Sequence, residues 1–268
     1  MTGAKPRVSY AELTPRERIA GLVDAGSFRE ILDPFDRVSS PYLAEQGIVA
    51  QRDDGVVIGR ARLAERDIAL AAIDGRFLGG SVGEIGGAKI ACVLERASEG
   101  ALLLLDTGGI RLQEANLGIL AVAEICDAVV ALRARAPVIA VIAGRVGCYG
   151  GLSIAASLCS YIIVSEFARF GLNGSEVVEQ EAGPDELDAS DRAAIWRETG
   201  GTRRVAQGHA DILVDDDIDA VRKAVLAGLH LRHERERLST SRLRATIAEF
   251  APSRSAEIAP PATRQSLP

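Results

Sequence analysis

Two parts of the chain share one order of apolar and polar positions. Residues 102–105 form an uninterrupted apolar run that is followed by DTGG, and residues 137–142 form a second run that is followed by AGRVGCYGG. A helical pattern begins directly after each pair of glycines. Short apolar runs without alternation are typical of strands that are buried on both faces. The pattern therefore predicts two buried strands, each ending in a glycine turn that leads into a helix.

Other segments predict the elements around these two units. Alternation predicts a hairpin from strands 56–63 and 67–73, whereas segment 27–41, with two prolines, predicts an irregular arm. We also expect a helix over 14–25 that begins at Thr14 and Pro15, because these residue types favour a helix start. The remaining expected elements are a helix from about Gly83 with Ile85, Ala88, Cys92 and Glu95 on one side, a long helix with the apolar stripe Leu117, Leu120, Ala121, Ile125, Ala128, Val129 and Leu132, strands at 161–164 and 210–214, and a helix from Asp215 through about Glu236.

Repetition of strand, turn and helix with short connections indicates parallel strands with helices packed outside them. The expected fold is therefore α/β. We expect residues 1–50 to form an N-terminal helix and arm, 51–250 to form the α/β domain with C-terminal helices, and 251–268 to form a disordered tail rich in Ser, Pro, Ala and Thr.

Composition narrows the classes of function. The 268 residues are 47% hydrophobic and carry a formal net charge of −6, with no interleaved basic and aromatic surface. Nucleic acid is therefore not an expected partner. No apolar run approaches the roughly twenty residues that cross a bilayer, and the first residues lack the apolar core of a signal peptide. We expect a cytoplasmic protein that does not bind membranes.

The cysteine, histidine and aspartate positions do not predict a metal site. Cys92, Cys126, Cys148 and Cys159 are isolated and match neither a zinc pattern nor a disulfide framework. Cys92, Cys126 and Cys159 are expected to be small core residues, whereas Cys148 lies within the second glycine turn, with nothing beside it in the sequence that would obviously lower its pKa. His209, His230 and His233 are expected on exposed helices or loops. Asp215, Asp216 and Asp217 could hold a cation, but a solvated helix start explains them better because no other oxygen-rich segment supports a cage.

The two glycine turns are the candidate chemistry. Glycine allows main-chain N–H groups to approach a ligand without a Cβ atom in the way, and the positive end of the following helix favours negative charge at the same point. Two such turns could converge on one anionic oxygen. Taken alone, each glycine pair is equally explained by a tight turn or by close helix packing.

Three segments, DTGGIRLQEANLG, VIAGRVGCYGGLSIAASLCS and FGLNGSEVVEQEAG, resemble the carboxyltransferase branch of the crotonase superfamily. Within that branch the chain is most similar to the beta subunits of biotin-independent malonate decarboxylases, over most of its length. The zinc ribbon of bacterial acetyl-CoA carboxylase beta subunits is absent from the sequence. Two departures are Ser175, where the family usually has proline, and a short connection between Glu95 and Ala101.

The resemblance implies a crotonase-like ββα superhelix of the carboxyltransferase type. It also implies a subunit that decarboxylates malonyl-[acyl-carrier protein] to acetyl-[acyl-carrier protein] and CO2 through an enolate held in backbone oxyanion holes. By this resemblance, Gly108 and Gly109 would form one such hole and Gly150 and Gly151 the other. Ile110 and Leu152 are alternative amide donors, and Ile110, Arg111, Tyr149 and Leu152 are the expected substrate contacts.

The proton that reaches the carbanion has several candidate sources. Tyr149, Glu114 and Arg111 lie on or beside the glycine turns, yet Tyr149 could instead form a wall of the pocket, Glu114 could cap its helix, and Arg111 could pair with an acid. Water or a residue of another subunit could equally donate this proton.

The resemblance also implies partners and a carried substrate. The expected partners are a homologous gamma subunit whose interface contains the active site, an acyl carrier protein subunit and an acyl-carrier transferase subunit. The malonyl group would arrive on the phosphoribosyl-dephospho-CoA arm of the carrier, with no cofactor or metal bound covalently by this chain. The alternatives are a carboxyltransferase subunit of a biotin-dependent acyl-CoA carboxylase and a non-catalytic scaffold subunit.

Overall fold

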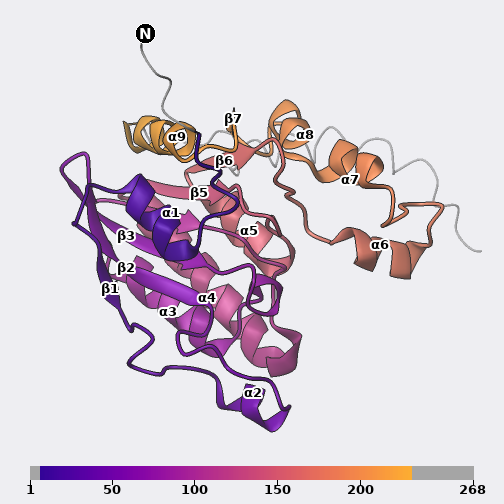
Figure 1. Ribbon diagram of the computed structural model, residues 1–268, viewed down its shortest axis with the longest axis horizontal. Coiled ribbons are helices and arrows are strands. Elements are labelled where there is room, and N and C mark those ends of the chain that lie inside the picture. The colour runs from indigo at the N-terminus through magenta and orange to yellow at the C-terminus, as the bar shows by residue number, and fades with distance from the viewer. Residues whose placement is uncertain (1–6, 231–268) are drawn as a thin grey trace, which may run out of the picture. The chain divides into compact units, whose positions relative to one another are not determined.

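The computed structural model describes residues 7–230, which form a mixed sheet with helices on both faces (Figure 1). These residues belong to one compact unit. The strands lie in the sheet in the order of the sequence and are β1 (Arg29–Ile31), β2 (Val56–Leu63), β3 (Arg66–Ile73), β4 (Ala101–Leu104), β5 (Val138–Ile142), β6 (Tyr161–Ser165) and β7 (Ile212–Val214). The helices are α1 (Pro15–Leu22), α2 (Pro41–Glu45), α3 (Glu84–Glu95), α4 (Asn116–Arg133), α5 (Gly150–Leu158), α6 (Ser175–Ala182), α7 (Arg192–Thr199), α8 (Gly201–Ala206) and α9 (Ile218–His230), with 3-10 turns η1 (Leu78–Gly80) and η2 (Leu112–Glu114).

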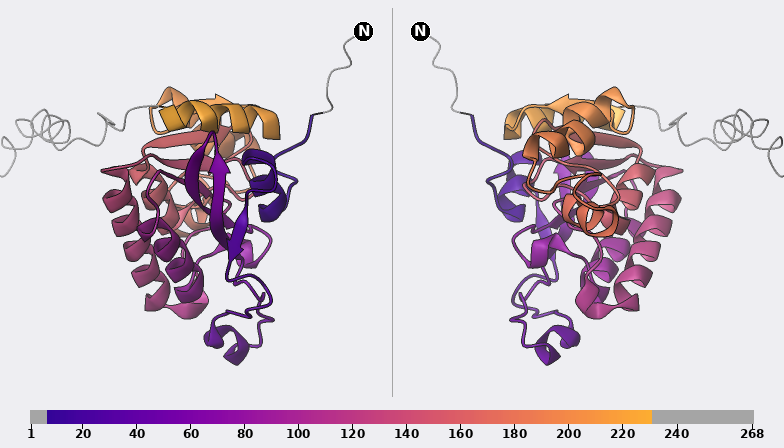
Figure 2. Two further views of the ribbon diagram at one scale, coloured as in Figure 1. Left: turned by 90° about the vertical axis from the view of Figure 1, so that its left-hand side faces the viewer. Right: turned by 90° about the vertical axis from the view of Figure 1, so that its right-hand side faces the viewer.

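The sheet changes from antiparallel to parallel at β3. Strands β1, β2 and β3 pair antiparallel, and every later neighbour pairs parallel, with Leu70 opposite Leu102 and Leu102 opposite Ile139. Helices α3, α4 and α5 pack on one face of the sheet, and α1 and α9 pack on the other (Figure 2). In parallel strands the carboxyl ends share one edge, so the turns that follow β4, β5 and β6 come together there.

The predicted hairpin, buried strands and long helices are confirmed, but α1 ends at Leu22 rather than at residue 25, and α9 begins at Ile218 rather than at Asp215. The largest shift concerns the helix expected directly after Gly109, because η2 comes first and α4 begins only at Asn116. Helix α5 begins at Gly150 rather than Leu152, so that both glycines of the second turn lie in its first turn. Segment 27–41 differs from the prediction because residues 29–31 form strand β1, which pairs with β2. On α4, Leu120 was expected in the buried stripe but is 60% exposed.

One side of α3 is exposed to solvent, and the other packs against α4. Ala88, Cys92 and Glu95 face solvent, whereas the glycine pair 86–87 is buried. A Cβ atom on Gly87 would lie 2.2 Å from the Cβ of Ala121 on α4, so the glycines allow the two helices to pack closely. Close approach of the two backbones, not the size of the side chains, therefore decides which side of α3 is buried.

Helix α1 begins with the capping arrangement that the sequence predicted. The Thr14 hydroxyl accepts the Glu17 N–H at 3.2 Å, and the Glu17 carboxylate accepts the Thr14 N–H at 2.8 Å. We expect Thr14→Ala to lower the free energy of unfolding by about 1 kcal/mol, because one amide of the first turn loses its acceptor. Urea denaturation followed by circular dichroism measures this difference. Thr14→Ser, which keeps the hydroxyl, should retain most of the stability.

The three adjacent aspartates before α9 are not simply a solvated helix start. Asp216 accepts the Ala11 N–H at 2.9 Å, Asp217 accepts the Val8 N–H at 3.1 Å, and Asp215 pairs with Arg7. The acids therefore hold the N-terminal segment against the start of α9.

Several other predictions have definite outcomes. Cys159 is buried as expected, Cys126 is half-buried, and Cys92 is exposed rather than in the core, while Cys148 is buried within the second glycine turn. His209 and His230 are exposed, as predicted. His233 and the predicted tail 251–268 lie outside the described residues. None of the helices in residues 7–230 is long and apolar enough to cross a membrane.

Candidate active site

The first glycine turn follows β4 and is fixed by hydrogen bonds on both sides. The Gly108 N–H donates to the Gly79 carbonyl at 2.8 Å, and the Gly109 N–H donates to the Thr107 hydroxyl at 3.0 Å. The Gly109 carbonyl in turn accepts the Val82 N–H at 2.8 Å. The turn is thus clamped against residues 79–82, directly before α3.

The second glycine turn follows β5 and lies along the first. The Thr107 N–H donates to the Gly147 carbonyl at 2.8 Å, and the Tyr149 N–H donates back to the Thr107 carbonyl at 3.0 Å. On its other side, the Cys148 N–H donates to the Arg169 carbonyl at 2.9 Å. Gly147 has φ of +93°, and a Cβ atom there would lie 2.3 Å from the Arg169 oxygen, so only glycine fits.

The two glycine turns converge, which was the central geometric expectation. A Cβ atom on Gly109 would lie 3.0 Å from the Gly150 Cα, and one on Gly150 would lie 3.2 Å from the Gly109 Cα. Both residues have positive φ, +112° and +58° respectively. We name this contact between Gly109 and Gly150 the glycine corner. Its backbones approach so closely that neither position has room for a side chain.

The hydrogen bonds around the glycine corner limit which amides can bind a ligand. Gly108 and Gly109 already donate within the chain, and the Gly150 N–H donates to the Leu172 carbonyl at 2.7 Å. The Ile110 N–H has no acceptor within residues 7–230, and Gly151 and Leu152 belong to the first turn of α5, whose amides lack acceptors four residues earlier. The backbone N–H groups that remain free to bind a ligand are therefore that of Ile110 in the first turn, which was the alternative donor there, and that of Gly151 or Leu152 in the second turn.

The side chains predicted to contact substrate differ in their surroundings. Ile110 is half-buried and packs on the core beside Gly118, and Leu152 is 1% exposed within that core. Tyr149 is 7% exposed, and its hydroxyl has no hydrogen-bond partner among the described residues. Burial raises the pKa of Tyr149, which opposes its ionisation.

Arg111 lies behind the first glycine turn with all its polar contacts inside the chain. Its side chain is fully buried, and its guanidinium donates to both carboxylate oxygens of Asp54 at 2.9 Å and to Glu114 at 2.9 Å. A further N–H donates to the Ser81 carbonyl at 3.0 Å. Arg111 therefore supports the turn that carries the Ile110 amide, and a substrate contact by Arg111 stays a prediction.

The two acids that bind Arg111 also reach the start of α3. Glu114 accepts the Glu84 N–H at 2.7 Å, and Asp54 accepts the Gly86 N–H at 3.1 Å. These amides are at the helix N-terminus, where negative charge is favourable. The network of Arg111, Asp54 and Glu114, named here the Arg111 network, joins the first glycine turn to α3.

A second buried ion pair supports both glycine turns from the opposite side. Asp106, the residue before the first turn, accepts the Val146 N–H of the second turn at 2.8 Å. Its other oxygen accepts from Arg18 of α1 at 3.1 Å, and both side chains are almost fully buried. A Cβ atom on Gly144 would lie 2.1 Å from the Asp106 carboxyl carbon, so the second turn packs directly on this carboxylate.

Cys148 does not behave as a reactive thiol in this arrangement. It is fully buried within the second glycine turn, and burial raises its pKa well above the ordinary value. A thiol becomes a nucleophile only as thiolate, which this environment disfavours. Residues 7–230 contain no group of three or more side chains placed to hold a metal ion.

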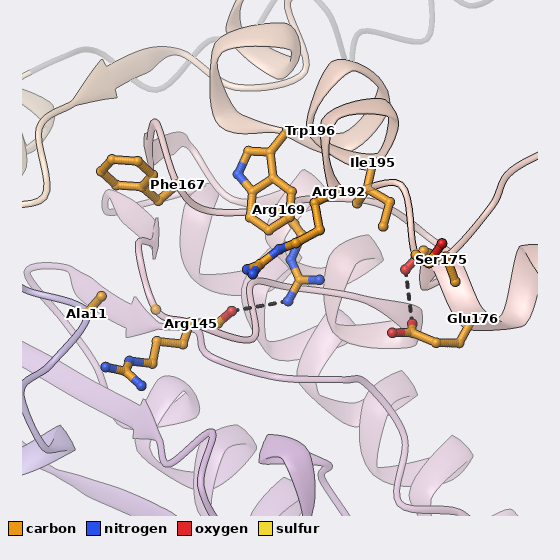
Figure 3. Close-up of a pocket in the computed structure, with 12 residues that line it drawn as sticks. Ala11, Arg145, Phe167, Arg169, Ser175, Glu176, Arg192, Ile195 and Trp196 are labelled. Atoms are coloured by element: carbon orange, nitrogen blue, oxygen red, sulfur yellow. Dashed lines mark hydrogen bonds between the residues drawn. The ribbon is translucent and has the colours of Figure 1, made fainter.

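A cavity of about 600 Å³ lies beside the second glycine turn, between the ends of β5 and β6 and helices α6 and α7 (Figure 3). It contains basic, aromatic and hydroxyl side chains. Arg169, which follows β6, has its guanidinium over the rings of Tyr149 and Trp196. Ser175, at the position where the family usually has proline, is the first residue of α6, and its hydroxyl donates to Glu176 at 3.1 Å. Either residue type suits a first helical position, so this departure leaves α6 intact.

Sequence reasoning placed the glycines, but it missed the residues that hold them. Asp54 and Arg18 lie 57 and 88 residues away from their partners Arg111 and Asp106 in the sequence. One feature of the sequence could have identified Asp106 as a supporting residue, because it stands between a buried strand and a glycine pair. No such feature identifies Arg169, because the residues around it, 168–172, form only a short apolar segment.

Comparison with known proteins agrees with this architecture. The family model for the carboxyl transferase domain matches residues 7–266. The malonyl-S-ACP:biotin-protein carboxyltransferase MADC of Malonomonas rubra is 41% identical over 239 residues, which cover 82% of this chain and 75% of that protein.

Two solved structures are similar over nearly their whole length. A chain of a Pseudomonas malonate decarboxylase hetero-tetramer in complex with malonate has a TM-score of 0.87 and 51% identity, covering 94% of each chain. A chain of the Pseudomonas malonate decarboxylase MdcD-MdcE hetero-dimer has a TM-score of 0.75 and 46% identity, covering 91% of this chain and 97% of that one. The expected crotonase-like carboxyltransferase fold is confirmed. By its sequence match and its fold, the chain belongs to the carboxyl transferase domain family.

Proposed function

We propose that this chain is the beta-type subunit of a biotin-independent malonate decarboxylase, which converts malonyl-[acyl-carrier protein] to acetyl-[acyl-carrier protein] and CO2. The observation that carries the proposal is the glycine corner, where two turns that follow adjacent parallel strands meet. The similarity to malonate decarboxylase chains supports the substrate.

The reaction needs stabilisation of one negative charge. When the bond between the carboxylate carbon and the α-carbon breaks, its electron pair forms an enolate whose charge rests on the thioester oxygen. One preorganised N–H donor at such an oxygen contributes about 2.7 to 4 kcal/mol to the transition state. We assign the Ile110 amide to one donor and the Gly151 or Leu152 amide to the other, since these amides are uncommitted.

A proton must then reach the α-carbon to give the acetyl thioester. Arg111 and Glu114 are bound to each other and fully buried, which makes them poor donors to an external substrate. Tyr149 is the remaining candidate within this chain, and water or a residue of a partner subunit are the candidates outside it.

The relatives also suggest an assembly. We infer a homologous gamma-type chain that completes the active site, together with an acyl carrier protein and its transferase, because the similar structures are hetero-oligomers of malonate decarboxylase. The malonyl group would arrive on a phosphoribosyl-dephospho-CoA arm that belongs to the carrier. Localisation in the cytoplasm remains part of this proposal.

Release of labelled CO2 from malonyl-[acyl-carrier protein] by the purified complex tests the proposal. We expect release without added biotin protein. The rival activity is carboxyl transfer to or from biotin, as the name of the Malonomonas rubra relative describes. If CO2 release required a biotin protein, or if the complex carboxylated acetyl-CoA from carboxybiotin instead, the chain would be a transferase subunit.

A further inference from the structure

We propose that the cavity beside the second glycine turn binds the phosphate group of an organic ligand through Arg169 and Arg192. The inference deepens the proposed function and rests on it only for one source of the phosphate, the arm of the carrier. The cavity lies at the carboxyl ends of β5 and β6, the edge of a parallel sheet where ligands commonly bind.

Arg169 is held in place while its charge stays uncompensated. One terminal nitrogen of its guanidinium donates to the carbonyls of Arg145 and Val146, both at 3.2 Å. The group lies 5.1 Å from the centre of the Trp196 ring and 5.8 Å from that of Tyr149. Its Nε is buried without an acceptor, and within residues 7–230 no carboxylate pairs with it. The side chain is thus preorganised for an anion.

Arg192 adds a second uncompensated cation from another element. It is the first residue of α7, its guanidinium lies 5.5 Å from the centre of the Trp196 ring, and no described carboxylate forms an ion pair with it. Arg145 differs, because its side chain pairs with Glu12. Two unneutralised guanidinium groups match the two negative charges of a phosphate monoester, or of the diphosphate in a dephospho-CoA arm, better than the single charge of a carboxylate.

The remaining walls indicate an organic ligand rather than inorganic phosphate alone. A volume of about 600 Å³ is within the range of pockets that hold drug-sized ligands. Figure 3 shows Phe167 and Trp196 as apolar surfaces on one side and Glu176 with Ser175 on the other. The Glu176 carboxylate repels a phosphate but accepts from a hydroxyl or amide N–H, so the phosphate belongs at the arginines and a polar arm extends toward Glu176.

The single tryptophan of the chain makes the test specific. Trp196 fluorescence of the full chain would be titrated with 4′-phosphopantetheine, with pantetheine and with inorganic phosphate. We expect a saturable change with phosphopantetheine, at least about tenfold weaker binding of pantetheine, and at least about tenfold weaker binding of phosphopantetheine to Arg192→Gln, because a charge-assisted contact is lost. Arg197→Gln, an exposed position on the same helix that does not line the cavity, is the matched control.

The outcomes separate the sources of the phosphate and the two proposals. Tighter binding of phosphopantetheine than of inorganic phosphate supports an organic ligand and points to the arm of the carrier as its source, whereas equal affinity overturns the proposal of an organic ligand. Equal binding of pantetheine, or unaltered binding by Arg192→Gln in a chain that melts like the wild type, overturns the site. Because no catalysis is measured, failure here leaves the decarboxylase proposal standing.

Discussion

Gly109→Ala should lower kcat for malonyl-[acyl-carrier protein] decarboxylation by about 100- to 1,000-fold. The new Cβ would lie 3.0 Å from both the Gly150 Cα and the Tyr149 carbonyl oxygen, at a residue whose φ is +112°. The two turns must then move apart, and the Ile110 amide moves with them. Loss of one oxyanion donor costs about that much in rate. Steady-state kinetics of the assembled complex measure the change.

A matched control separates this effect from the general cost of positive φ. Gly26 has φ of +69°, is exposed, and has open space where a Cβ would stand. Gly26→Ala therefore imposes a similar backbone strain, about 1 to 2 kcal/mol, without touching the glycine corner. Gly26→Ala should leave kcat unchanged.

The second residue of the glycine corner gives an independent test. Gly150→Ala, with φ of +58° and a Cβ 3.2 Å from the Gly109 Cα, should lower kcat as Gly109→Ala does. Full activity of both corner variants in a folded complex would favour the scaffold alternative.

The glycine corner could be predicted because its causes are local in the sequence. Each turn consists of an apolar run and a glycine pair, which in the second turn starts α5 and in the first is separated from α4 by η2. Parallel strands bring their carboxyl ends to the same edge of a sheet. The choice of amide could not be predicted in the same way. The N–H groups of Gly108 and Gly150 cannot bind a ligand because they donate to the carbonyls of Gly79 and Leu172, which are about twenty to thirty residues away in the chain. Hydrogen bonds between backbone groups that far apart in the chain leave no recognisable pattern of side chains in the sequence.

The same limit explains why the sequence could not identify the partners of α3 and of Arg111. Glycines 86–87 indicate an element packed closely against α3, but that this element is Ala121 depends on where α4 lies. For Arg111, which stands beside the first turn, the sequence left a substrate contact and an ion pair with an acid open, and the structure shows the ion pair. Its main partner, Asp54, lies in the loop before β2, and only the folded chain brings the two together.

Arg111→Met should lower the free energy of unfolding by about 3 to 5 kcal/mol. Removing the cation leaves Asp54 and Glu114 buried without their counter-ion, and uncompensated buried charge is the costly result of breaking such a pair. The triple variant Arg111→Met, Asp54→Asn and Glu114→Gln should recover most of this loss, because no buried charge remains. Urea denaturation of the three proteins measures the difference, and a triple variant as unstable as Arg111→Met would mean that packing dominates.

The pH dependence identifies charge as the cause. Burial already raises the pKa of Asp54 above its ordinary value, and the loss of Arg111 should raise it further. A carboxyl whose pKa is higher in the folded than in the unfolded state loses stability as pH rises through that interval. The loss of unfolding free energy in Arg111→Met should therefore shrink as pH falls from neutrality toward the ordinary carboxyl pKa.

A surface ion pair provides the control. Arg60→Met, which breaks the half-exposed pair with Asp67, should lower the free energy of unfolding by less than about 1 kcal/mol. Since the Arg111 network also holds the turn that carries the Ile110 amide, Arg111→Met should lose kcat even where it remains folded.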